Sequence, residues 1–241
     1  MQLRLPDDKL RVVKEELSKF RHRKRATKVQ LQSLVGKLIW VSSVVYGGRA
    51  FLRRLINAMN TLRHKSHKLR FSADTLLDIK WWLAFMPQFN GKSLLLESMP
   101  VSALYTDACN EGAGGHWGDS WFYCNWKMDY PNVAPLHINE KEVVAATLAV
   151  QNWAPQLANK RVYIFSDNAV TVACINKCTS RNNRIMQCLR YLFWLSVQFN
   201  FYLTARHIPG KHNTCADCVS RLHDPEFFSD FVCTDIGTSA S

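Results

Sequence analysis

The stretch Val101-Ser102-Ala103-Leu104-Tyr105-Thr106-Asp107 decides the fold, because it alternates apolar and polar residues as a strand does and ends on an acid. Glycines between residues 112 and 118 and an aromatic run over 121–126 predict two further strands, and so a meander. Downstream, the spacing of apolar residues predicts helices over 140–153, 168–177, 183–198 and 215–222, and strands over 161–166 and 200–205. This order, βββαβααβα, is that of an α/β domain with a mixed sheet.

Before residue 99 the apolar spacing is helical throughout. It predicts helices over residues 7–26, 28–45, 51–62 and 71–85, the last begun by a Ser72 cap and closed by Pro87. We therefore expect an all-helical segment over residues 1–98, an α/β domain over 99–223 and a disordered tail over 224–241.

The helical segment carries nearly all of the positive charge. Residues 1–98 hold 20 Lys/Arg against 7 Asp/Glu, a net of +13, while residues 99–241 hold 11 against 12, a net of −1. Such a surface attracts a polyanion through counterion release. The alternative is that these charges only form the solvent-exposed face of the helices. Nucleic acid is the usual partner, and the densest cluster for phosphate contacts is Arg21, Arg23, Lys24 and Arg25.

Four acids stand at the ends of predicted core elements. Asp107 ends the first strand and Asp167 follows the fourth, while Glu142 lies in the first turn of the helix between them and Asp217 opens the last helix. Each alone is typical of a helix cap or an exposed charge. If they converge at one sheet edge, two carboxylates about 4 Å apart repel by roughly 4 kcal/mol at an effective dielectric of 20, which only cations or protons relieve. Carboxylate oxygens select Mg²⁺ or Mn²⁺, and two such ions can assist phosphodiester hydrolysis.

Four motifs carry a resemblance to a known family. They are Tyr105-Thr106-Asp107-Ala108, residues 138–145 (INEKEVVA), Phe165-Ser166-Asp167-Asn168 and residues 207–221 (HIPGKHNTCADCVSR). Over about residues 100–222 the chain thus resembles retroelement ribonuclease H domains. The preceding part resembles the thumb and connection region of reverse transcriptases. Its segments LPDDKL and LQSLVGKLIW are most similar in sequence to DIRS-like, tyrosine-recombinase retrotransposons.

The resemblance implies an RNase H-like mixed five-stranded sheet with flanking helices, and endonucleolytic hydrolysis of the RNA strand of an RNA–DNA hybrid. It places the metal ligands, for two Mg²⁺ or Mn²⁺ ions, at Asp107, Glu142, Asp167 and Asp217. His207 falls on the family's mobile histidine, which assists product departure or shuttles a proton. Glu140 competes with Glu142, but the family pattern selects Glu142, and residues two apart do not share a helical face.

Several smaller features bear on substrate recognition. Asn168 and Asn213 are candidates for hydrogen bonds either to the hybrid's minor groove or within their own loops. Gly112, Gly114 and Gly115 would allow a nucleic-acid strand close to the backbone, or serve only the hairpin turn. Only residues 179–182 separate the two helices between which some relatives carry a basic protrusion, so phosphate contacts are expected from residues 1–98.

Other classes of protein fit less well. In integrase-type transferases the glutamate follows the second aspartate, whereas here Glu142 precedes Asp167, and proofreading exonucleases need an Asp-x-Glu that Asp107-Ala108-Cys109 lacks. The non-enzymatic alternative is a domesticated or decayed module that binds nucleic acid or a partner without cleavage. No Tyr-x-Asp-Asp motif occurs, so we expect no polymerase activity from this chain and a palm and fingers region on the same or another chain.

The chain shows no sign of export or membrane insertion. It has no uncharged apolar run of about 18 residues, and its start is not a signal peptide, so we expect an intracellular protein of the cytoplasm or nucleus. We therefore expect the eight cysteines to be reduced thiols. Cys215 and Cys218 form a C-x-x-C without a second pair at zinc-ribbon spacing, which disfavours zinc there.

Overall fold

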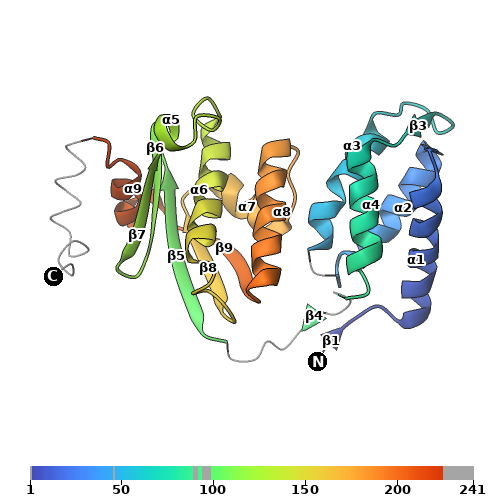
Figure 1. The fold of residues 1–241 in the computed structure, drawn as a ribbon, viewed down its shortest axis with the longest axis horizontal. Coiled ribbons are helices and arrows are strands. Elements are labelled where there is room, and N and C mark those ends of the chain that lie inside the picture. The colour runs from blue at the N-terminus through green and yellow to red at the C-terminus, as the bar shows by residue number, and fades with distance from the viewer. Residues whose placement is uncertain (1, 46, 89–91, 94–98, 225–241) are drawn as a thin grey trace. The chain divides into compact units, whose positions relative to one another are not determined.

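The computed structural model describes residues 2–45, 47–88, 92–93 and 99–224. The chain divides into two compact units, Met1–Glu97 and Ser98–Ser241 (Figure 1). The tail predicted to be disordered, 224–241, lies outside the described residues from 225 onward.

The first unit is helical, with two short ribbons that the sequence did not predict. Its helices are α1 (Asp7–His22), α2 (Lys28–Val41), α3 (Arg53–Asn60) and α4 (Ala73–Phe85), with a 3₁₀ helix over Gly48–Phe51. The ribbons pair β1 (Gln2–Leu3) with β4 (Lys92–Ser93), and β2 (Arg25–Thr27) with β3 (Lys68–Arg70), both antiparallel. The expectation of an entirely helical segment was therefore wrong in this detail.

The β2–β3 ribbon explains why α1 ends earlier than predicted. The backbone of residues 25–27 pairs with β3 and so does not continue the helix. Thr27 then begins α2 with a capping box: its hydroxyl accepts from the Gln30 N–H, and the Gln30 side chain accepts from the Thr27 N–H. The predicted Ser72 cap of α4 is confirmed, since its hydroxyl accepts from the Thr75 N–H.

Apolar residues at helical spacing form the core of the first unit. Leu17, Leu34 and Ile79 are fully buried, and so is Trp82, whose indole N–H donates to the Phe51 carbonyl at 3.1 Å. The helices are thus held by burial of their apolar stripes, with one buried acid, Asp78 of α4, paired with Arg54 at 3.0 Å.

The second unit is built on a five-stranded mixed sheet. Its elements are β5 (Val101–Ala108), β6 (Gly112–Trp117), β7 (Ser120–Asn125), α5 (Trp126–Asp129), α6 (Ile138–Trp153), β8 (Arg161–Ser166), α7 (Ala169–Lys177), α8 (Asn183–Gln198), β9 (Tyr202–His207), a 3₁₀ helix over Gly210–His212 and α9 (Thr214–Ser220). The strand order is β7-β6-β5-β8-β9. β5, β6 and β7 are antiparallel neighbours, whereas β5, β8 and β9 run parallel. The predicted fold class is confirmed, with the one-turn helix α5 as an addition.

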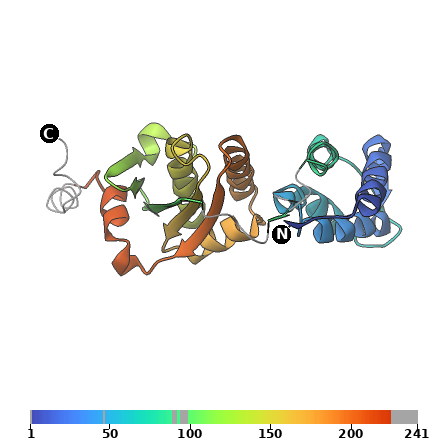
Figure 2. The same cartoon turned by 90° about the horizontal axis from the view of Figure 1, so that it is seen from below.

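Helices cover both faces of this sheet. α6 and α8 lie together on one face, and α9 lies on the opposite face against β5 and β6 (Figure 2). On the α6 side, Ala145 packs against Ala108, Ala113, Cys124 and the fully buried Trp126. On the edge strand β9, the side-chain amide of Asn176 in α7 exchanges two hydrogen bonds with the Ala205 backbone, which blocks strand pairing at that residue.

Several boundaries differ from the sequence prediction by one to four residues, and two of these differences in the second unit have a clear structural cause. α6 begins two residues earlier, because the His137 ring accepts from the Asn139 N–H and caps it. β9 begins two residues later, because Asn200 adopts a left-handed conformation, φ +52°, that turns the chain after α8. The cysteines of the described part are free thiols, as expected, and no helix there is long and apolar enough to cross a membrane.

Candidate active site

Parallel pairing of β5 with β8 brings two acids to one edge of the sheet. Tyr105 pairs with Phe165, and the same register continued by two residues sets Asp107 beside Asp167. Glu142 reaches the same point from α6. One carboxylate oxygen from each of the three lies within 4.8 Å of the others, so these three predicted ligands do converge.

Glu142 is held in place by neighbouring strands. It lies in the second turn of α6, not the first as predicted, because that helix starts at Ile138. The Ser166 hydroxyl lies 3.5 Å from Glu142 Oε2 and the Ala108 backbone N–H also donates to the carboxylate. Within the described residues, Glu140 belongs to no such acidic cluster.

Asp107 is tied to the last helix. The Ser220 hydroxyl donates to Asp107 Oδ2 at 2.6 Å and also to the Asp217 carbonyl at 2.8 Å. The role of Ser220 was missed from the sequence, although its place three residues after Asp217 in the fourth motif puts both on one helical face.

Burial makes the ionised form of this cluster costly. Asp107 and Glu142 are only 5% and 4% exposed. Burial, followed by the charges of Asp107 and Asp167, raises the pKa of Glu142 to about 9. Burial likewise raises the pKa of Asp107 to about 6; the Ser220 hydrogen bond opposes this, while Asp217 and Asp167 add to it.

Asp217 stands beside the cluster without joining it. Arg221, one turn later on the same side of the chain, donates from Nε to Asp217 Oδ1 at 2.8 Å. Asp217 is nevertheless near enough to raise the pKa of Asp107. The structure thus brings three of the four predicted ligands together and places the fourth in an ion pair next to them.

The loop after β9 closes over Asp167. His207, the last residue of β9, is exposed, and its Nε2 lies 3.1 Å from the Asp167 carbonyl oxygen. A Cβ on Gly210 would lie 3.1 Å from Asp167 Oδ2, so the glycine of the fourth motif allows this close approach. The predicted mobile histidine therefore lies at the edge of the acidic cluster.

The two candidate asparagines have internal partners. Asn168 caps α7 by accepting from the Thr171 N–H, and its amide donates to Asn139 at 2.8 Å. Asn213 is 2% exposed and donates to the Thr106 carbonyl at 3.0 Å. Of the two uses considered for these side chains, hydrogen bonding within the protein is the one that the geometry favours.

The glycines of β6 have a packing role that the sequence did not suggest. A Cβ on Gly114 would lie 2.5 Å from Val219 Cγ1 and 2.7 Å from the Ser220 nitrogen, and one on Gly112 would lie 2.8 Å from the Ser220 carbonyl. Gly112 and Gly114 thus make room for α9, whereas a Cβ on Gly115 would lie 2.6 Å from the Tyr105 carbonyl of β5. Because α9 carries Asp217 and Ser220, this close approach positions the site.

Basic residues gather on the first unit at the β2–β3 ribbon. Arg21, Arg23, Lys24 and Arg25 are all exposed, as a phosphate-binding cluster requires. The ribbon adds Lys68 and Arg70, which sequence reasoning missed because the pairing is not visible in the chain; Arg25 stands directly opposite Arg70. Two like charges opposite each other on an antiparallel ribbon are destabilising unless an anion lies near.

No protein-family model and no curated protein matches the chain. Among solved structures, RNase H1 from the halophilic archaeon Halobacterium salinarum NRC-1 is 16% identical, with a TM-score of 0.41, over 54% of this chain and 98% of its own. The foamy viral protease-reverse transcriptase is 11% identical in complex with dsDNA, with a TM-score of 0.33, over 85% of this chain and 41% of that chain.

The same foamy viral enzyme in complex with an RNA/DNA hybrid is 10% identical, with a TM-score of 0.33, over 84% of this chain and 27% of that one. The present chain thus spans less than half the length of the foamy viral enzymes. Its RNase H-like fold class rests on the order and direction of its own five strands.

The chemistry of the donor set fits a hard divalent cation. Three carboxylates offer oxygen ligands at one point, and the hydrogen-bond donors to Asp107 and Glu142 in the described part of the chain are hydroxyls and a backbone N–H. These neutral groups do not compensate the charge of three ionised acids. Such a set suits Mg²⁺ or Mn²⁺.

Proposed function

We propose that the chain hydrolyses the RNA strand of RNA–DNA hybrids endonucleolytically, as part of a retrotransposon reverse transcriptase. The observation that carries this proposal is the meeting of Asp107, Glu142 and Asp167 within 4.8 Å at the carboxyl ends of two parallel strands. Burial raises the cost of their negative charge, so the site favours a cationic partner over an empty ionised state.

Asp107, Glu142 and Asp167, with Asp217 beside them, would hold two Mg²⁺ or Mn²⁺ ions. When bound, such ions activate a water and stabilise the leaving oxygen of a phosphodiester. The protein's own groups orient the ligands: Ser220 holds Asp107, and Ser166 holds Glu142. His207 lies on the exposed side of Asp167, where an imidazole can move a proton or assist product departure.

The basic cluster of the first unit would supply phosphate contacts. Arg21, Arg23, Lys24 and Arg25 form its predicted part, and Lys68 and Arg70 extend it across the ribbon. Phosphate contacts position a duplex without reading sequence, which suits an enzyme that acts on any hybrid. The hybrid's 2′-hydroxyls would mark the strand to be cut.

The wider setting follows from the motifs. We infer that residues 1–98 are the thumb and connection of a DIRS-like reverse transcriptase, and that the palm and fingers, on the same or another chain, are their partner. The protein would then work in the cytoplasm or nucleus. Truncated, fragmentary and domesticated versions of such an element are distinguished by the flanking genomic sequence.

A cleavage assay tests the activity. The full chain is incubated with a hybrid labelled on its RNA strand, in Mg²⁺ and in EDTA. We expect internal cuts in the RNA that need Mg²⁺ and that disappear in Asp107→Asn, Glu142→Gln and Asp167→Asn. Glu140→Gln is the matched control, because it makes the same change on the same helix outside the cluster, and it should cut normally.

Binding and cleavage are measured on the same samples, so that the alternative is tested directly. Hybrid binding without cleavage by the wild-type chain would support a domesticated, non-enzymatic module. Cleavage that survives Asp107→Asn or Asp167→Asn would place the chemistry elsewhere.

A further inference from the structure

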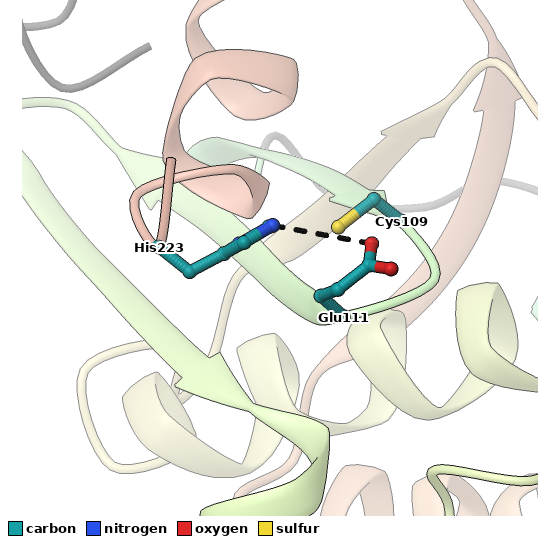
Figure 3. Close-up of side chains that lie close together, drawn as sticks. All are labelled: Cys109, Glu111 and His223. Carbon is teal, nitrogen blue, oxygen red and sulfur yellow. Dashed lines mark ion pairs between the residues drawn. The ribbon is translucent and has the colours of Figure 1, made fainter. Parts of the chain in front are cut away.

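A second group of side chains that could bind a metal lies on the same unit and shares no residue with the three carboxylates. Cys109 and Glu111 come from the loop between β5 and β6, and His223 follows α9 (Figure 3). One ligand atom from each lies within 4.8 Å of the others, and His223 Nε2 is 3.9 Å from Glu111 Oε2. We propose that Cys109, Glu111 and His223 bind a zinc ion.

The loop presents Cys109 and Glu111 in a fixed geometry. Cys109 and Gly112 exchange two contacts: the Cys109 N–H donates to the Gly112 carbonyl at 2.9 Å, and the Gly112 N–H donates to Cys109 Sγ at 3.2 Å. The fully buried Trp126 holds the loop from below, with its backbone N–H on the Glu111 carbonyl and its indole N–H on the Cys109 carbonyl. These contacts fix the backbone of the loop that carries Cys109 and Glu111.

The third ligand arrives through the packing of α9. Because Gly112 has no side chain, the Ser220 carbonyl and the Tyr123 ring both lie against it. The chain leaving α9 then passes over the loop, and the His223 ring stacks on Tyr123, with centroids 6.5 Å apart and planes 18° apart. The imidazole is thereby directed at the loop from outside, as Figure 3 shows.

The donor set discriminates between metals. Sulfur, imidazole nitrogen and a carboxylate oxygen are the ligands of zinc, with water able to complete a tetrahedral site. The three carboxylates of the candidate active site are all hard oxygen donors, which prefer Mg²⁺. With Mg²⁺ in excess, the carboxylates should therefore hold Mg²⁺, and Zn²⁺ should bind at the site that offers sulfur and nitrogen.

Zinc binding has a defined cost and consequence. In the structure the Cys109 thiol donates to the Ser220 carbonyl at 3.3 Å. Coordination replaces the S–H bond by an S–Zn bond, releases one proton to solvent and frees that carbonyl. The ion would join the end of α9 to the β5–β6 loop by a stronger link, and α9 carries the Ser220 hydroxyl that holds Asp107. The zinc would thus stabilise the unit without taking part in hydrolysis, whether or not the proposed nuclease function holds.

The test is made on the metal-free full chain in excess Mg²⁺, which occupies carboxylate sites. One equivalent of Zn²⁺ is added, and the zinc retained after gel filtration is measured by atomic emission. Co²⁺ is used in parallel, because a sulfur-to-cobalt charge-transfer band reports a thiolate ligand specifically. We expect one zinc per chain and a thiolate band.

Substitutions identify the ligands. Glu111→Gln and His223→Gln change side chains at the surface, and each should weaken zinc binding at least tenfold, since even the loss of an outer-shell partner costs about 10–100-fold. Cys109→Ser should abolish the cobalt band. Cys215→Ser and His212→Gln are matched controls from the same unit and should leave both readouts unchanged.

Three results would overturn the proposal. They are no retained zinc in the wild-type chain, zinc retention without a thiolate band, and full affinity in the folded Glu111→Gln and His223→Gln variants. The cleavage assay is read separately, so failure of the zinc site and failure of the nuclease function are distinguishable.

Discussion

Glu142 gives the metal-free protein a stability that depends on pH. Its pKa is raised from 4.5 to about 9, so between these limits the unfolded chain has lost the proton that the folded protein keeps. The folded state then binds more protons, and the free energy of unfolding falls as pH rises. The stabilisation from protonated Glu142 is complete below the unfolded pKa and is lost as pH rises toward about 9.

The expected size follows from this proton. One proton held only by the folded state changes stability by about 1.4 kcal/mol per pH unit. Asp107 also lowers the free energy of unfolding as pH rises, but because its pKa is about 6, most of its effect occurs below that pH. Between about pH 6.5 and pH 8.5, Glu142 alone should lower the stability of the metal-free second unit by about 3 kcal/mol.

Urea denaturation in EDTA at these two pH values measures the effect. Pulsed hydrogen exchange with mass spectrometry of β5 and β8 peptides follows the second unit apart from the first. Glu142→Gln has no proton to lose, so its stability should change by about 3 kcal/mol less than that of the wild type across the window. Glu140→Gln is the matched control and should behave as the wild type. Mg²⁺ should remove most of the fall in the wild-type protein, because it binds the ionised site.

Equal pH dependence in the wild type and Glu142→Gln would refute the reasoning. It would mean that Glu142 ionises in the folded protein as freely as in water. A fall in the wild type that Mg²⁺ does not reverse would show instead that the buried charge is real but that the site does not hold this ion.

Three further predictions address the packing, the site and the basic cluster. Gly114→Ala should destabilise the second unit by about 1–3 kcal/mol in thermal unfolding, because the added Cβ meets Val219 and Ser220 of α9. Gly36→Ala on α2 should stabilise the first unit by about 0.5–1 kcal/mol, because nothing lies within 4 Å of the added Cβ. Ser220→Ala removes the hydrogen bond that lowers the pKa of Asp107, so the acid limb of the cleavage pH profile should move to higher pH; an unmoved limb would contradict this. Arg25→Ala and Arg70→Ala should each weaken hybrid binding and reduce the salt slope in anisotropy titrations by about 1, and an unchanged slope would exclude phosphate contact.

Local sequence predicted most elements of the second unit well. β8 and α8 have the predicted bounds, because their apolar periodicity is strong and turn residues flank them. The first unit's ribbons escaped prediction, since β2 and β3 are three residues each and their pairing joins segments about 40 residues apart. α1 looked longer than it is for the same reason.

The candidate site divides along similar lines. The motifs identified Asp107, Glu142 and Asp167; the parallel register of β5 and β8 brings the two aspartates together, and the packing of α6 on the sheet adds Glu142. The sequence suggested no role for Ser220, and it left Asn213 open between minor-groove contact and a hydrogen bond within its loop, whereas the partner in the structure is the Thr106 carbonyl of β5. Such partners lie more than 100 residues apart, so only the packing of α9 reveals them.

By itself, then, the sequence determined the order of the main strands and helices of the second unit and the acids that follow its core strands, because periodicity and turn chemistry act over a few residues. Tertiary structure decided how α9 lies on the glycines of β6, that Asp217 pairs with Arg221, and that Cys109 meets His223. These outcomes depend on how closely helices and loops that are distant in the chain pack against the sheet, and local sequence patterns do not encode that packing.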